Sequence, residues 1–578
     1  MYAPSAYGQV PTGTPRSPLF GVKKFTQPFR RLSLQTPCLL QNVGSEAVFP
    51  VTLGEGNAKG RSYHQDFDDW KAANPGKPTI ENPFRNPTTN RGPMEGRPPG
   101  EVFAHQRWEE FFPKVGYVLS LSEIAGGQSF HPNLPDQAAT SVWTYGAGKG
   151  TGIGQLPPPL IKGRYGEPIL TRIYNYLPDD VTKNGDFGRN EHQLHFHNAH
   201  NGAESDGAAN VHHFPGTFYD YRWSTTLARR DKINTHATVK KASGPDGNGG
   251  LVQVAGDFRE LQGTMWAHDH RFFFTAENVY KGMLMMVNYY SGPDRGNDKI
   301  TDGVNLKLPS GSLLDWGNID FDVNLAVHDL ATASDGQLFF DVFTTDGFLG
   351  DILCVNMTYA PFMEVLPRKY RFRILNACMS RFIKLALSWN WTAVPFQFIA
   401  NDGNFVVNPI DLLELDEQGT AERYDIVVDF SRFRIGDRVY LVNLLQQRDG
   451  RKPDEALTLR EAMIGVPDKD PTVGPLMEFR VVGSVNSVDV PGYVHKSTTL
   501  DKSVVPTTLT QQIPIVQPVR TRVVEFGRSG TGDSRNPATG ECTPDCPETA
   551  TNFPWTIKIN GEDAHSFNAN RISLLIPK

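Results

Sequence analysis

Residues 166–178, GEPILTRIYNYLP, alternate apolar and polar side chains between two prolines. Successive side chains of a β-strand point to opposite faces, so this alternation predicts a strand. Pro168 and Pro178 mark the limits of the strand, because proline lacks the N–H group that a sheet interior uses. The stretch therefore indicates a β-sheet protein.

The same kind of pattern recurs along the rest of the chain. Turn residues separate the strand-like runs at intervals of roughly ten residues, a spacing typical of antiparallel sandwiches and barrels. Only residues 453–463, PDEALTLREAM, have the pattern of a helix. The further strand-like runs are residues 313–330, 337–343, 368–377, 382–389, 421–431, 437–445, 476–483, 521–527, 555–561 and 572–578.

Length and composition agree with several β domains. A chain of 578 residues is too long for one hydrophobic core, and about three or four domains are expected. The 54 glycines and 43 prolines favour short strands joined by turns over long helices. A net charge of −6 without a basic stripe argues against a nucleic-acid partner. No apolar run reaches the ~18 residues of a membrane span.

The changes in pattern predict four segments. Residues 1–112 are rich in proline, glycine and asparagine and are expected to form an irregular N-terminal extension. A first β domain is expected over residues 113–300 and a second over residues 301–490. Residues 491–578 are expected to form a linker and an incomplete third domain.

The N-terminus and the cysteines give little information about the compartment. No apolar signal core is present, and the pair Arg30–Arg31 is predicted to be ordinary surface charge. Five cysteines are few and odd in number, which argues against a disulfide framework. Cys542 and Cys546 are expected to be surface thiols or a local disulfide. The localisation is therefore left unknown.

Two histidine triplets carry the chemistry. His195 and His197 lie in residues 193–202, QLHFHNAHNG, and His268 and His270 lie in residues 263–270, GTMWAHDH. Random placement of 15 histidines in 578 residues predicts fewer than one such triplet. Residues two apart on a strand share a face, so two facing strands offer four ring nitrogens to one site. Neutral imidazoles with few carboxylates favour copper or zinc over magnesium or calcium.

Other conspicuous side chains have simpler explanations. His200, His212 and His213 are predicted to be polar residues with ordinary hydrogen-bond partners and not metal ligands. Met283, Met285 and Met286 are predicted to pack in a strand core, because methionine commonly fills gaps there.

Residues from about 116 to 578 resemble a multicopper oxidase of the laccase-like, three-cupredoxin-domain kind. Residues 195–207, HFHNAHNGAESDG, resemble the first copper motif of that family, and residues 263–270 followed by NVYKGM resemble the second. Residues 349–387 and 421–431 resemble its second domain. The resemblance implies an all-β fold of tandem cupredoxin-like Greek-key sandwiches or barrels, here with a long irregular N-terminal extension.

The resemblance also implies roles for single residues. His195 matches the ligand of the mononuclear type 2 copper, and His197, His268 and His270 match ligands of the binuclear type 3 pair. Asp206 matches an acidic residue that lies near the copper cluster and relays protons to reduced oxygen. An alternative interpretation of Asp206 as a turn residue before Gly207 stays open.

The remaining family motifs, H-P-x-H-x-H and H-C-H, are not found in residues 1–578. The type 1 copper site is therefore expected to lie on a second polypeptide that completes the third domain. With that partner, the chain is expected to be a copper-dependent oxidoreductase that couples oxidation of a phenolic or metal-ion reductant to reduction of dioxygen to water. The alternative is a non-catalytic copper-binding or structural protein derived from such an oxidase.

Overall fold

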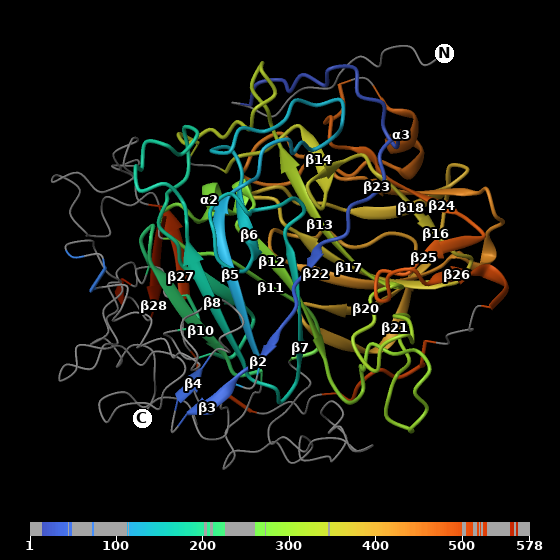
Figure 1. Cartoon of the computed structure of the whole chain (residues 1–578). Helices are drawn as coiled ribbons and strands as arrows, with labels where there is room; N and C mark the ends of the chain where they lie inside the picture. Colours follow the sequence, from blue (N-terminus) through green and yellow to red (C-terminus); the bar gives the residue numbers. More distant parts are fainter. Residues whose placement is uncertain are drawn as a thin grey trace.

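The structure is a computed structural model of the whole chain. Besides isolated residues at 72–73, 75, 113, 517–518 and 521, it describes residues 14–43, 46–48, 115–201, 205–207, 212–225, 261–271, 273–344, 347–466, 468–499, 505–512, 524–528, 555–559 and 562–563. Strands dominate these residues, and two strand-rich bodies lie side by side (Figure 1). The predicted all-β fold of tandem cupredoxin-like sandwiches is confirmed.

The first sandwich packs two sheets around one apolar core. Buried residues from both sheets, among them Phe196 and Trp223, fill the space between them. The first sheet has the order β1 (Ser33–Leu34), β7 (Pro159–Arg164), β12 (Leu284–Tyr290), β11 (Gly263–Asp269) and β9 (Leu194–His197). The second has the order β10 (Phe218–Trp223), β8 (Ile169–Asn175), β5 (Val115–Glu123) and β2 (Cys38–Leu39), with β6 (Trp143–Ala147) also paired to β5.

The stretch 166–178 contains β8, as its pattern predicts. All seven residues of β8 are buried. Arg172 is tolerated there because its guanidinium donates two hydrogen bonds to the buried carboxylate of Asp220 on β10, at 2.8 and 2.9 Å. Charged side chains remain inside a protein only when paired in this way.

The second sandwich follows the same plan, with one sheet of seven strands and one of five. Its core lies between a sheet of order β15 (Thr358–Tyr359), β14 (Ile352–Val355), β13 (Asp322–Leu330), β17 (Lys369–Asn376), β22 (Arg423–Asp429), β20 (Phe396–Asn401) and β21 (Asn404–Leu412), and a second sheet. The second sheet has the order β16 (Phe362–Val365), β24 (Gly474–Val481), β23 (Arg438–Asn443), β18 (Leu385–Trp389) and β19 (Thr392–Ala393).

The two sandwiches meet along β11 and β12. Trp266 of β11 and Met286 of β12 share an apolar cluster with Ala326 of β13 and Leu375 of β17. The cluster is buried, so the second sandwich supports the strand that carries the second histidine motif.

Part of the predicted N-terminal extension joins these sheets. Strand β1 pairs in parallel with β7, and Pro28 bridges to Phe362 of the second sandwich. The prediction that Arg30 and Arg31 are ordinary surface charge is wrong. Arg30 donates to the carbonyls of residues 129 and 357, and Arg31 donates to those of residues 319 and 320.

Short helical elements interrupt the strands in the described part of the chain. Helix α3 (Leu459–Ile464) overlaps the C-terminal half of the predicted segment 453–463, and Thr458 and Glu461 form a capping box at its start. Helix α2 (Thr275–Lys281), directly after the second histidine motif, was not predicted. The 3₁₀ turns are η5 (Phe430–Arg432) and η6 (Ser497–Thr499).

Three small sheets complete the described strands. They contain β25 (Ser484–Asn486) with β26 (Val494–Lys496), β3 (Gln41–Val43) with β4 (Glu46–Val48), and β28 (Trp555–Ile559) between β27 (Val524–Arg528) and β29 (Glu562–Asp563). Cys542, Cys546 and residues 572–578 lie outside the described residues. The domain limits at residues 112, 300 and 490 stay predictions.

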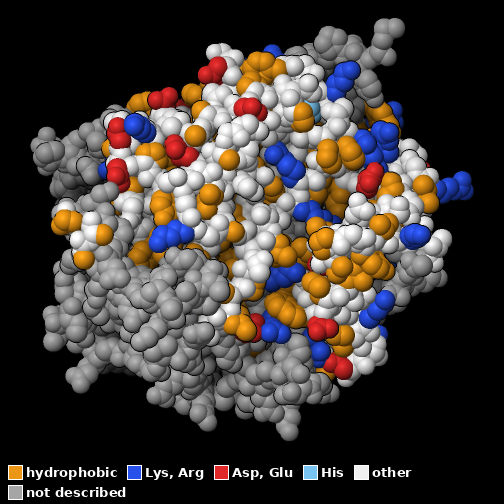
Figure 2. Space-filling model, in the orientation of Figure 1, with side chains coloured by type: hydrophobic (Ala, Val, Ile, Leu, Met, Phe, Trp, Pro, Cys, Tyr) orange, Lys and Arg blue, Asp and Glu red, His pale blue; other side chains and the backbone are white. Residues whose placement is uncertain are grey.

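Charges of both signs are mixed on the face of the molecule shown in Figure 2. On the described part of the face in Figure 2, basic side chains are interspersed with acidic and apolar ones. Among the helices that the structure describes, none has the length and apolar character needed to cross a membrane.

Candidate metal centre

The two histidine motifs lie on neighbouring antiparallel strands. In the register of β9 and β11, His195 is opposite His268 and His197 is opposite Trp266. His270 follows directly after β11, and its backbone N–H donates to the carbonyl of Gln193. Because i and i+2 share a face, the register brings both motifs to the same side of the sheet.

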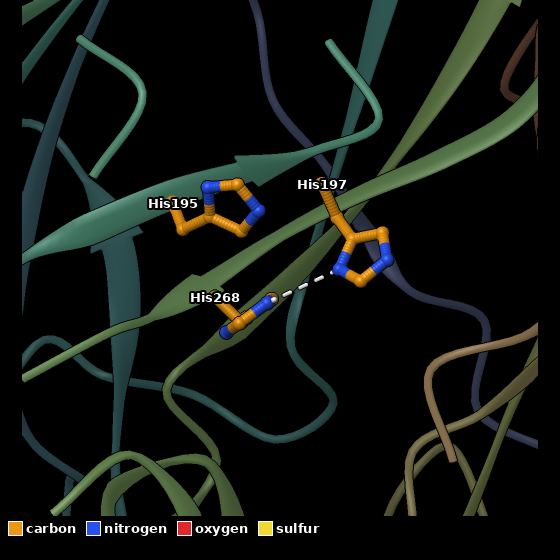
Figure 3. A group of neighbouring side chains, drawn as sticks. All are labelled: His195, His197 and His268. Carbon is orange, nitrogen blue, oxygen red and sulfur yellow. Dashed lines mark hydrogen bonds between the residues drawn. The ribbon is translucent and has the colours of Figure 1, made fainter. Parts of the chain in front are cut away.

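The four imidazoles form one group. The ring centroid of His195 lies 5.5 Å from that of His197, 5.3 Å from that of His268 and 5.2 Å from that of His270. Ring nitrogens of His195, His197 and His268 all lie within 4.8 Å of one another. Figure 3 shows these three rings around a common space. The four predicted rings thus lie near one another, with the nitrogens of His195, His197 and His268 closest together, and their role as metal ligands stays a prediction.

Backbone carbonyls orient two of the rings. Nδ1 of His195 contacts the carbonyl oxygen of Asp206, and Nδ1 of His268 lies 2.8 Å from that of Asp269. A proton on each Nδ1 would satisfy these carbonyls and leave each Nε2 with a lone pair. Nε2 of His268 lies 3.5 Å from Nδ1 of His197 (Figure 3). Hydrogen bonds from a ring N–H to a backbone carbonyl commonly fix the tautomer and orientation of metal-binding histidines.

Burial keeps the four rings uncharged. It lowers the pKa of His197 to about 3, with the charge of Arg423 and neighbouring histidines as further causes. Burial and His195 lower the pKa of His270 to about 4 and that of His268 well below its ordinary value. Burial also lowers the pKa of His195, although the hydrogen bond to the backbone carbonyl of Asp206 acts to raise it. Neutral imidazoles at pH 7 have the lone pairs that metal binding requires.

Asp206 lies in a turn that packs against β9. Gly207 has a left-handed φ of 87°, and a Cβ atom there would lie 2.6 Å from the Cα atom of His195. Only glycine permits this approach without displacement. The Asp206 side chain is 45% exposed, with Oδ1 3.8 Å from Nδ1 of His195. The turn thus places a carboxylate beside the histidine group.

No protein-family model matches the chain, but curated relatives do. A bilirubin oxidase from Albifimbria verrucaria is 28% identical over 337 residues, which cover 57% of this chain and 47% of the relative. A laccase from Bacillus stratosphericus is 28% identical over 340 residues, which cover 55% of each chain. The chain is a relative of the laccase-like multicopper oxidases.

This multicopper oxidase relative spans about half the length of the curated proteins it matches. Among solved structures, a multicopper oxidase from Aquifex aeolicus has a TM-score of 0.48 and 19% identity, with 77% of this chain and 71% of that chain covered. The fold described above rests on the strand pairing of this chain itself.

Asp269 and Trp266 support the histidines of this multicopper oxidase relative, and neither was predicted as a site residue. The carboxylate of Asp269 is buried and accepts hydrogen bonds from the backbone N–H of Gln193 and Arg271 and from the amide of Asn278. Its position between His268 and His270 signals a side chain on the opposite face of the strand. The Trp266 ring stacks on that of His268, with centroids 4.1 Å apart.

His213 and the three methionines match their predicted structural roles. Nε2 of His213 lies 2.8 Å from Nδ1 of His192, and both rings are buried. The core prediction for Met283, Met285 and Met286 is confirmed, since all three are fully buried in apolar clusters. The His212 ring packs on Phe214, with centroids 5.3 Å apart, but its buried Nδ1 has no hydrogen-bond partner among the described residues, contrary to the prediction.

The donor set fits the copper that the relatives' family implies. Imidazole nitrogen is a good ligand for copper, and among the described residues the grouped ligand atoms are the ring nitrogens of His195, His197 and His268. Nδ1 of His270 is buried without a hydrogen-bond partner among the described residues. An unpaired buried polar atom is costly, and a metal or bound water beside it would remove that cost.

Proposed function

We propose that the chain is the large part of a copper-dependent oxidoreductase that reduces dioxygen to water. The observation that carries the proposal is the convergence of four uncharged imidazoles from β9 and the end of β11. The relationship to a bilirubin oxidase and to laccases supports copper as the metal and an oxidase reaction. A phenolic compound or a metal ion is the proposed reductant.

The four histidines would divide between two kinds of copper. His195 is proposed to hold the type 2 ion, and His197, His268 and His270 the type 3 pair. Bound copper would supply the one-electron chemistry that links the reductant to dioxygen. The chain keeps the rings neutral by burial and holds their orientation through the carbonyls of Asp206 and Asp269.

Asp206 is proposed to move protons to the reduced oxygen. Reduction of one dioxygen molecule to two waters consumes four electrons and four protons. Asp206 is partly exposed, so it can exchange protons with solvent, and its carboxylate lies beside His195. A carboxyl group in this position can act as a general acid. The turn conformation at Asp206 and Gly207 is compatible with this role.

A second polypeptide is proposed to bring the type 1 copper and the remaining ligands. Residues 1–578 contain no cysteine with a histidine on either side. The rings of His195, His197 and His270 are only partly buried among the described residues, so one side of the group is accessible to further ligands. The partner is expected to carry the H-P-x-H-x-H and H-C-H motifs.

Purification of the native assembly tests these proposals. Its copper content, its visible spectrum and the mass of every copurifying polypeptide would be measured together. The expected result is copper with the intense blue band of a thiolate-bound ion, present only with the second polypeptide. Full oxidase activity from a pure 64.2 kDa chain would contradict the partner proposal.

The same preparation separates the oxidase from the alternative function. A fully copper-loaded assembly that consumes no dioxygen with phenolic or metal-ion reductants would favour a non-catalytic copper-binding protein. A wild-type chain that binds no copper would contradict both the oxidase function and the copper-binding alternative.

A further inference from the structure

Arg423 connects the second sandwich to the strands that carry the histidines. It begins β22, and its guanidinium is almost fully buried. Nη2 donates to the side-chain oxygen of Asn198 at 2.7 Å, and Nε donates to the carbonyl of Thr264 at 3.2 Å. Nη1 pairs with Asp402 at 2.9 Å, which balances the charge. One planar side chain thus reaches both β9 and β11.

Arg423 occupies the place where β9 would continue. Strand β9 ends at His197, because Asn198 adopts a left-handed φ of 64° and the N–H of residue 199 turns back to the carbonyl of Phe196. In the register of β9 with β11, residue 199 would have faced Thr264. The Thr264 carbonyl accepts from Arg423 instead. The Arg423 side chain therefore takes the place of the next β9 residue as the hydrogen-bond donor to β11 beside His197.

A second contact docks β11 on the same edge of the second sandwich. The hydroxyl of Thr264 donates to the carboxylate of Asp425 at 2.6 Å, and Asp425 also accepts from Arg371 at 2.6 Å. This contact holds β11 without touching β9. Among the bonds described here, the link from Arg423 to Asn198 is the one that ties the end of β9 to the second sandwich.

We propose that Arg423 is a positioning residue that sets the separation of His197 from His268 for copper, by holding Asn198 and Thr264 with one guanidinium. The proposal rests on the proposed copper site. Two nitrogens on separate strands bind one centre only if the strands keep their spacing. A planar guanidinium with fixed N–H directions does this better than a flexible ammonium.

The test measures cuprous ion affinity of the purified full chain by competition with a chromophoric chelator, and the cupric electron paramagnetic resonance spectrum. Arg423→Lys keeps the positive charge but loses the planar set of N–H donors that reaches both Asn198 and Thr264. Asn198→Gly removes the acceptor while glycine tolerates the left-handed conformation. Asn198→Asp keeps an oxygen acceptor, and aspartate also tolerates that conformation. Arg381→Lys is the matched control, because Arg381 is equally buried and pairs with Asp329 and Asp470.

Arg423→Lys and Asn198→Gly are each expected to weaken copper binding by about 10-fold or more, as loss of outer-shell partners does in other metal sites. The double variant should lose little more than either single variant, since both remove one link. Asn198→Asp should keep the wild-type copper affinity and spectrum, in contrast to Asn198→Gly. A merely structural role of Arg423 would not produce this difference.

Wild-type affinity in folded Asn198→Gly would overturn the inference, as would an equal loss in Arg381→Lys. If Arg423→Lys does not fold, the glycine and aspartate variants at position 198 still decide, because that residue is exposed. If the wild-type chain binds no copper, the proposed function fails, and the inference fails with it. Normal wild-type binding with unaffected variants leaves the function intact and removes only the role of Arg423.

Discussion

His195 and His268 occupy directly opposite positions in the antiparallel pair of β9 and β11, with ring centroids 5.3 Å apart. A slip of one residue in this register would turn one histidine pair to the opposite face. The register is therefore the feature on which the candidate metal centre depends. Phe196 and Ala267, which alternate with the histidines, are buried in the first core and oppose such a slip.

Substitution of Gly207 by alanine is expected to destabilise the protein and weaken copper binding. The added Cβ would lie 2.6 Å from the Cα atom of His195, and the left-handed φ adds strain. We expect a loss of roughly 3 kcal/mol in unfolding free energy, from about 1 kcal/mol of strain and the rest from overpacking. Thermal unfolding and a copper titration measure the two effects.

Gly127→Ala is the matched control for that substitution. Gly127 also has a left-handed φ, of 78°, but no atom lies within 4 Å of its added Cβ. The control should lose only about 1 kcal/mol and bind copper normally. Equal losses for the two variants would show that contact with His195 is unimportant.

Asp206→Asn is expected to keep copper and to slow dioxygen reduction. The backbone carbonyl that contacts His195 is unchanged, so the ring stays oriented, while the carboxyl group that exchanges protons is lost. A decrease of ~10²-fold in turnover of the complete oxidase is typical for removal of a general acid. Unchanged turnover with full copper content would leave Asp206 as a turn residue only.

Acidification is expected to destabilise the second sandwich through His328. Burial lowers the pKa of His328 to about 3, and Nε2 has no partner among the described residues. The ordinary value in an unfolded chain is about 6.5. The folded pKa is the lower one, so this contribution is complete above about pH 6.5 and is lost as the pH falls toward 3.

Comparison with His328→Leu isolates this effect, because the other titrating groups are common to both chains. The wild-type protein should lose up to about 1.4 kcal/mol more per pH unit than the variant below pH 6.5. Urea unfolding at several pH values between 7 and 4 measures the two slopes. Parallel slopes would mean that His328 does not titrate on unfolding.

The periodicity of the sequence was sufficient for the fold class but not for burial. Alternation in residues 166–178 places β8 correctly, yet Arg172 lies inside because Asp220, 48 positions away, neutralises it. Helix α2 was missed because its seven residues follow a strand with no strong cap: Phe274 makes no side-chain capping bond. A local sequence pattern cannot predict an ion pair or a hydrogen bond between residues that are far apart in the chain.

The same limit applies to the candidate site. The i and i+2 spacing of the histidines predicts a shared face on each strand, and the register brings the two faces together. The support from Arg423 comes from another domain, 225 positions from Asn198, and no spacing rule predicts it. Residues 421–431 are predicted as a strand and resemble the family's second domain, but neither pattern indicates a contact with Asn198.

Copper titration of the full chain against a His195→Gln and His268→Gln double variant tests the central claim most directly, with His495→Gln as a control because that residue contacts Asp320 and lies outside the group. The account predicts that the wild-type chain and the control bind copper with the X-ray absorption signature of imidazole nitrogen, and that the double variant loses this binding while it remains folded. Equal copper binding by the wild-type chain and the double variant, or no binding by either, would contradict it.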